Sequence, residues 1–130
     1  MKYKEVIIEE DLSIYDSQMK KINMYKNDNH IIFIEVFIEL TYPKHTFLKL
    51  IFEDVIEYSF YWSEEYDFYI IESYKLLRSE DLTYYCSLDP ADTSSFISEN
   101  DSAIIRSKNL KAYYYSNKEL TNKKEIKFGI

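Results

Sequence analysis

Residues 31–42 read Ile-Ile-Phe-Ile-Glu-Val-Phe-Ile-Glu-Leu-Thr-Tyr, and this stretch decides the fold. β-branched and aromatic residues dominate it, and such side chains fit a pleated, half-buried surface. Every even position from 32 to 40 is aliphatic, whereas the odd positions include Glu35 and Glu39. This period of two predicts a strand that has one face in a core and the other face partly in water.

Segments of similar composition lie on both sides of this strand and are separated by short polar turns. We interpret Glu53-Asp54 as a break between two strands, and Pro43-Lys44 as a hairpin connection. Residues 68–77 are ambiguous, because their apolar side chains also fit helical spacing, but their composition favours a strand. The predicted strands cover residues 4–9, 19–25, 31–42, 46–52, 55–62, 68–77, 82–88, 103–105 and 110–115.

Short connections favour antiparallel pairing, because parallel neighbours need long crossovers. We therefore expect a mainly β fold (all-β or α+β), built as a single antiparallel sheet or half-barrel with one short helix at most. The 130 residues, 46% of them apolar, are predicted to form one domain over 1–130 that buries roughly two thirds of its unfolded surface. Residues 116–130 are rich in lysine, and we interpret them as a flexible basic tail.

Composition excludes several classes of site. Gly129 is the only glycine, so a glycine-rich phosphate loop or dinucleotide-binding motif cannot form. Cys86 is the only cysteine, which excludes an intramolecular disulfide and fits a reducing, cytoplasmic setting. No apolar run approaches the ~20 residues that span a bilayer, so we expect no membrane partner.

The residues that carry chemistry in other proteins are isolated here. His30 and His45 lie in or beside predicted turns, and neither has a second ligand at metal-binding spacing. Cys86 follows two tyrosines in a strand pattern, where a cysteine is typically a small buried residue. We therefore expect no catalytic residue, no cofactor and no metal. A hydrolase that uses paired carboxylates remains an alternative, because glycosidases and metal-dependent nucleases use such pairs.

Charge is strongly segregated along the chain. Residues 53–101 contain thirteen Asp and Glu against Lys75 and Arg78, a balance of −11, whereas residues 102–130 sum to +5. Aromatic residues are interleaved with these acids, and Trp62 fits either a core or an interface. The acids argue against direct nucleic-acid binding, which needs a cationic surface. The candidate partner-binding residues are Tyr61, Trp62, Glu64, Glu65, Tyr66, Asp67, Tyr69, Glu80, Asp81, Asp89, Asp92, Glu99 and Asp101.

Four short strings carry a family resemblance. They are Ser13-Ile14-Tyr15-Asp16-Ser17 with Ile22, Leu48-Lys49-Leu50-Ile51-Phe52-Glu53-Asp54-Val55, Ser87-Leu88-Asp89-Pro90, and Asn109-Leu110-Lys111-Ala112-Tyr113. They resemble strings in small bacterial immunity proteins, the antidotes encoded beside polymorphic or contact-dependent growth-inhibition toxins. The resemblance implies a cytosolic protein that binds one toxin domain and blocks it, and it carries over no functional residue.

The charge pattern agrees with this implication. Many toxin domains are nucleases, whose clefts are cationic because they hold phosphates, and an acidic face presents the matching potential. We expect an immunity protein that neutralises a basic toxin C-terminal domain, and the charge pattern favours a nuclease as that domain. A hydrolase and an accessory protein-binding domain unrelated to toxins are the alternatives. The oligomeric state does not follow from the sequence.

Overall fold

The computed structural model describes residues 3–8, 12–116 and 123–129, and the regular elements among them are all strands. The expected mainly β, antiparallel, single-sheet fold is confirmed. No described segment is a helix with the length and apolar character needed to cross a membrane. The strands are β1 (Tyr3–Glu5), β2 (Ile7–Ile8), β3 (Ser17–Lys26), β4 (Ile32–Glu39), β5 (Phe47–Ser59), β6 (Ile70–Ile71), β7 (Lys75–Ser79), β8 (Tyr84–Asp89), β9 (Ser102–Tyr115), β10 (Lys124–Glu125) and β11 (Phe128–Gly129).

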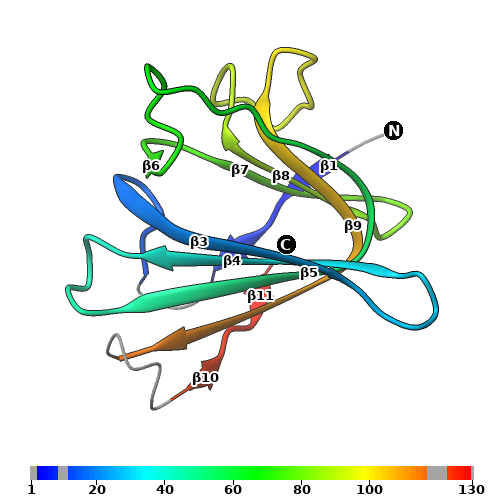
Figure 1. Cartoon of the computed structure of the whole chain (residues 1–130), viewed down its shortest axis with the longest axis horizontal. Helices are drawn as coiled ribbons and strands as arrows, with labels where there is room; N and C mark the ends of the chain where they lie inside the picture. Colours follow the sequence, from blue (N-terminus) through cyan, green and yellow to red (C-terminus); the bar gives the residue numbers. More distant parts are fainter. Residues whose placement is uncertain (1–2, 9–11, 117–122, 130) are drawn as a thin grey trace.

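The main sheet has the order β1-β7-β8-β9-β5-β4-β3-β6, with β10 beside β9, and β2 pairs with β11 in a separate ladder. Figure 1 shows the main sheet folded into two layers, β3 and β4 in one and β7 and β8 in the other. The long strands β5 and β9 run from one layer into the other. β6 and β7 follow each other closely in the chain, yet β6 pairs with β3 and β7 with β8. This short run of chain therefore links the two flanks of the sheet.

The core lies between these layers. Ile34, Val36 and Ile38 of β4 are completely buried, which matches the even-numbered face predicted for residues 31–42. Their neighbours across the ladder are likewise aliphatic or aromatic, since Val36 is opposite Leu50. Burying an aliphatic side chain of this size contributes roughly 1.5–3 kcal/mol, so the alternating face holds the layers together. The other core residues are Val6, Ile14, Met19, Leu40, Leu48, Leu50, Phe52, Ile71, Leu76, Cys86, Leu88, Ala103, Ile105, Leu110, Ala112 and Ile126.

The break expected at Glu53-Asp54 is wrong, because β5 runs through both residues. The ladder with β9 shifts register between Val55 and Glu57, and Asp54 has a φ of 57°. Aspartate tolerates this left-handed conformation better than most residues, so the acids accompany a bulge within the strand rather than a loop.

The gap expected between residues 105 and 110 is also wrong, since β9 is continuous. Lys108 Nζ lies 3.6 Å from Asp54 Oδ2, and Lys111 Nζ lies 3.5 Å from Glu53 Oε1. The polar interruptions of the two strands therefore face each other across the ladder. Opposite charges in this arrangement stabilise the pairing instead of ending it.

Two further segments differ from expectation. Residues 68–77 divide into β6 and the first part of β7, with a bend between them, and form no helix. The basic tail is part of the fold where it is described, because β10 pairs with β9 and β11 pairs with β2. Ile126 between them is buried in the core. Residues 117–122 and 130 of the predicted tail lie outside the described residues.

Candidate functional site

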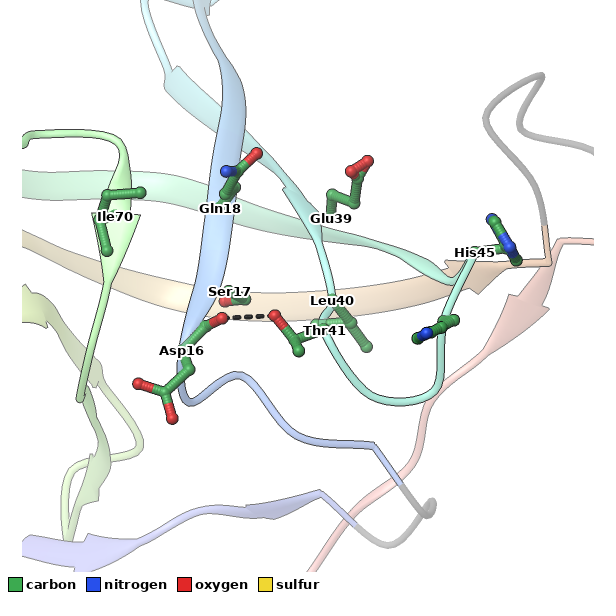
Figure 2. A pocket seen from close by; sticks show the side chains of 9 residues that line it. Asp16, Ser17, Gln18, Glu39, Leu40, Thr41, His45 and Ile70 are labelled. Atoms are coloured by element: carbon green, nitrogen blue, oxygen red, sulfur yellow. Dashed lines mark hydrogen bonds between the residues drawn. The ribbon is translucent and has the colours of Figure 1, made fainter.

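A polar hollow of about 440 Å³ lies where β3 begins and β4 ends. Asp16, Gln18, Glu39 and His45 line it, and Figure 2 shows that the carboxylates of Asp16 and Glu39 point in different directions. Thr41 Oγ1 donates a hydrogen bond to the Asp16 carbonyl oxygen. This bond connects the segment after β4 with the residue before β3. The two acids therefore do not form the converging pair on which acid–base hydrolysis depends.

The described residues contain no group of side chains that is arranged as a metal site. No three His, Cys, Asp or Glu side chains there are arranged so that they could hold one ion. His30 and His45 are both exposed, in keeping with their positions in or beside predicted turns. Cys86 is buried, and this burial raises the pKa of its thiol to about 12, so the reactive thiolate is strongly disfavoured.

Two loops meet at one end of the sheet and carry most of the predicted partner-binding residues. β5 ends opposite the beginning of β9, and Asp89 at the end of β8 is opposite Ser102. The 60–69 loop and the 90–101 loop therefore leave the sheet at the same end, at the top of Figure 1. Together they contain six acids and no Lys or Arg, and we call this region the acidic end. The six acids are Glu64, Glu65, Asp67, Asp92, Glu99 and Asp101.

Six rings at this end form a continuous cluster. Successive ring centroids are 5.2 to 6.3 Å apart, within the range of favourable aromatic pairs. Trp62 lies in the same loop and is 59% exposed, so it is a surface residue and not a core residue. Tyr61 and Tyr69 are also exposed. The aromatic cluster consists of Tyr58, Phe60, Tyr61, Tyr66, Phe68 and Tyr69.

Tyr66 links the 60–69 loop to the end of β8, directly before the 90–101 loop. Its hydroxyl donates a hydrogen bond to Asp89 Oδ2, and its ring lies between those of Tyr61 and Phe68. Burial, followed by this bond to a carboxylate, raises the pKa of Tyr66 to about 12. The phenol therefore stays protonated at neutral pH and keeps the link between the 60–69 loop and the end of β8.

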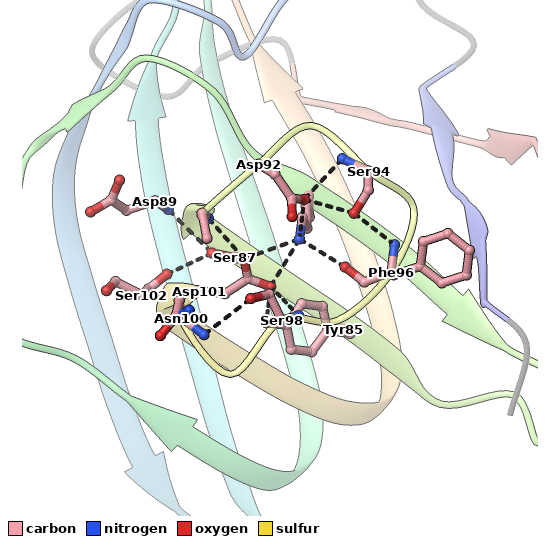
Figure 3. Close-up of polar contacts among 12 residues, drawn as sticks. Tyr85, Ser87, Asp89, Asp92, Ser94, Phe96, Ser98, Asn100, Asp101 and Ser102 are labelled. Carbon is pink, nitrogen blue, oxygen red and sulfur yellow. Dashed lines mark hydrogen bonds and ion pairs between the residues drawn. The ribbon is translucent and has the colours of Figure 1, made fainter.

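The 90–101 loop is built around a buried ion pair. Lys75 Nζ lies 3.0 Å from Asp101 Oδ1, and their side chains are 2% and 0% exposed. Asp101 also accepts hydrogen bonds from Tyr85 Oη and from the backbone N–H groups of Ala91 and Ser98. Figure 3 shows Tyr85 and Ser98 beside Asp101. Such complete hydrogen bonding is what allows two charges to be withdrawn from water.

The pKa values at this pair move in opposite directions. Desolvation alone would raise the pKa of Asp101, but the hydrogen bonds from Tyr85, the backbone and Lys75 outweigh it and hold that pKa below its usual value. For Lys75, desolvation acts to lower the pKa, and the bonds to Asp92 and Asp101 raise it instead. Bonds from Ser94 and then Lys75 lower the pKa of Asp92 to about 2. All three groups therefore remain charged at neutral pH.

Three of the predicted partner-binding residues have other positions or roles. Glu80 and Asp81 lie in the turn between β7 and β8, at the opposite end of that hairpin, so they are not part of the acidic end. Asp81 accepts hydrogen bonds from Ser79 Oγ and Thr83 Oγ1, which fix the turn. Asp101 is inaccessible to a partner because its side chain is fully buried. Its role is to shape the loop.

Lys75, Phe60 and Phe68 contribute to the site but were not among the predicted partner-binding residues. Lys75 had one signal in the sequence, because it is one of only two cations among thirteen acids. Its partner Asp101 is 26 residues away, so the pairing itself depends on the fold.

Comparison with protein-family models, with curated proteins and with solved structures gave no significant match.

Proposed function

We propose that the acidic end binds a basic protein domain and neutralises it, with a nuclease toxin domain as the partner. The observation that carries this proposal is the aromatic cluster with Trp62, which is left partly in water among acids. A folded protein gains by burying such rings, and soluble monomers rarely leave large apolar patches exposed unless they serve a contact.

The aromatic cluster has the properties of an interface centre. Tyrosine and tryptophan bring a large apolar area together with one polar tip, and they dominate the residues whose truncation weakens protein complexes most. The ring contacts and the Tyr66–Asp89 hydrogen bond already restrict several of these side chains. Binding would therefore cost less side-chain entropy than it does for free rotamers.

The charges around the aromatic cluster favour a cationic partner. Glu64, Glu65 and Asp67 are exposed. A nuclease holds phosphates and needs a cationic cleft, so its potential matches this end. The short strings that resemble immunity proteins support the choice of a toxin among basic proteins.

The decisive experiment uses the C-terminal domain of the protein encoded immediately upstream in the source genome. We expect its expression to arrest growth of a bacterial host, and co-expression of this chain to restore growth. Trp62→Ala should weaken the rescue, whereas Tyr25→Ala, an exposed aromatic side chain at the end of β3, should preserve it. Binding without rescue would indicate an accessory domain, and absence of binding by the wild-type chain would refute the proposal.

A further inference from the structure

Phe96 is the feature that the proposed function leaves unexplained. It lies in the 90–101 loop, and its side chain is 74% exposed, with exposed Ile97 beside it. Figure 3 shows the ring pointing away from the polar contacts of Asp92 and Asp101. In the free protein the exposed ring therefore lacks the hydrophobic stabilisation that burial would give it.

The backbone of Phe96 is nevertheless held on both sides. Its carbonyl oxygen accepts a hydrogen bond of 2.7 Å from the buried Lys75 Nζ, and its N–H donates to Ser94 Oγ at 3.3 Å. Ser94 Oγ in turn donates to Asp92 Oδ1 at 2.6 Å, and Asp92 lies 2.9 Å from Lys75 Nζ. The peptide groups next to the exposed ring are therefore fixed to the body of the protein.

The rest of the loop is held by the same centre. Asp101 accepts from the N–H groups of Ala91 and Ser98, at 2.8 and 3.0 Å, and Asn100 N–H donates to Ser98 Oγ at 3.1 Å. Lys75 and Asp101 thus hold the beginning, the middle and the end of the 90–101 loop. A side chain presented by such a backbone is pre-organised, because the loop does not have to be ordered when a partner binds.

We propose that Phe96 is a second anchor for the protein partner and enters an apolar pocket rimmed by Lys or Arg. This rests on the proposed function and names a contact that the 60–69 loop does not provide. The exposed acids of the loop that carries the ring are Asp92 and Glu99, and the loop contains no Lys or Arg, so a cationic surface around the pocket would match it. The Tyr66–Asp89 hydrogen bond connects the aromatic cluster to the last residue of β8, directly before this loop, so both loops belong to one contact region.

Lys75 acts as a positioning residue in this proposal. It is buried and does not reach the partner, but its ammonium group fixes the Phe96 carbonyl group and Asp92 together. Ser94 has the same role on the other side of Phe96 and is not part of the core. Loosening the loop at Ser94 should therefore lower affinity without removing the ring or a buried charge.

The first test needs no partner. Chymotrypsin cleaves after exposed aromatic residues when the surrounding chain can unfold locally, and mass spectrometry locates the cut. We expect the wild-type chain to resist cleavage between residues 96 and 97, and the Asp92→Ala/Ser94→Ala variant to be cut there at least about tenfold faster, since local opening governs such proteolysis. Rapid cleavage of the folded wild-type chain at this bond overturns the proposal, whatever the partner is.

The second test measures dissociation from the upstream-encoded toxin domain. Phe96→Ala should weaken binding by roughly thirtyfold, mainly through faster dissociation, and Ser94→Ala should weaken it less. Leu82→Ala is the matched control, because Leu82 is also an exposed apolar residue but lies in the turn between β7 and β8. Circular dichroism of each variant confirms that the strands are retained.

The outcomes separate the two proposals. Tight binding by Phe96→Ala, together with weak binding by Trp62→Ala, overturns the second anchor and leaves the proposed function in place. Failure of the wild-type chain to bind overturns the proposed function and the anchor together. A thirtyfold loss in Phe96→Ala, with Leu82→Ala unchanged, supports both.

Discussion

Lys75 Nζ and Asp101 Oδ1 lie 3.0 Å apart, and both side chains are almost completely withdrawn from water. The pair connects the beginning of β7 with the residue that precedes β9, across 26 positions of sequence. Removing one partner would leave the other as an uncompensated buried charge. The ion pair is therefore a requirement of the folded loop, whatever its net contribution to stability is.

Lys75→Met should lower the free energy of unfolding by about 3–5 kcal/mol, the usual effect of breaking a buried pair by removing one partner. Methionine fills a similar volume, so the loss reports the stranded Asp101 charge and not a cavity. Urea denaturation followed by circular dichroism measures it. The Lys75→Met/Asp101→Asn double variant should recover part of the loss, and a double variant as unstable as the sum of both single variants would contradict the pairing.

The stability should fall in acid. The pKa values of Asp92 and Asp101 are lower in the folded chain than their ordinary value of 3.8, so their contribution is complete above about pH 4. It is lost as the pH falls through the folded-state values, because the unfolded chain then binds protons more readily. The urea midpoint should therefore decrease as the pH is lowered from about 6 to about 2, because carboxylates titrate in this range. Asp101→Asn should reduce the slope.

Much of the fold follows from residue alternation. The buried even-numbered face at 31–42 was predictable because a strand with one wet face repeats every two residues. A turn between β3 and β4 also follows from the sequence, because Asn27, Asp28 and Asn29 accept turn conformations. The two continuous strands were not, since polar residues at Glu53 and Lys108 resemble turns until the partner strand is known. Their complementary charges meet only across the β5–β9 ladder.

The candidate site, like the fold, was only partly predictable from the sequence. Acids and aromatic residues over 60–69 indicated a surface, and the exposure of Trp62 agrees with that interpretation. Which acids share the acidic end depends on strand order, and so the sequence alone does not show that Glu80 and Asp81 lie at the other end of the β7–β8 hairpin. Nothing local to Asp101 marks it as buried, because its burial depends on a lysine in a different strand. Long-range pairing of this kind is not encoded in a window of sequence.

Cys86→Ser should destabilise the chain by about 1–3 kcal/mol, the cost of burying a hydroxyl that lacks a partner. Cys86 lies in the core, and burial raises the pKa of its thiol to about 12. Labelling of the native protein by a thiol reagent should accordingly be slow and should accelerate in urea. Fast labelling without denaturant would show that the thiol is accessible and contradict this position.

The purified chain should hydrolyse neither nucleic acids nor glycans, with or without added divalent metal. The reason is geometric: Asp16 and Glu39 point in different directions, and among the described residues no three His, Cys, Asp or Glu side chains are arranged to hold a metal ion. Release of labelled oligonucleotide and of reducing sugar measures the activity. Metal-dependent turnover that Glu39→Gln abolishes would favour the hydrolase alternative.

Charge and aromatic area at the acidic end should affect different rate constants for the toxin domain. Replacing Glu64 and Glu65 by Lys should slow association and flatten its dependence on salt, because steering acts before contact over a Debye length of about 8 Å. Trp62→Ala should instead speed dissociation by roughly thirtyfold, since the anchor becomes buried, and stabilises the complex, only after contact. Stopped-flow kinetics at low and physiological salt separates the two effects.

Glu80→Lys is the matched control for the charge reversal. Glu80 is exposed like Glu64 and Glu65, but it lies in the turn at the other end of the β7–β8 hairpin. It changes the net charge without changing the acidic end, so its association rate should stay close to that of the wild type. If Glu80→Lys slows association as much per charge as the Glu64/Glu65 reversal does, the effect comes from net charge alone. The acidic end would then be a solvated surface without a role in steering.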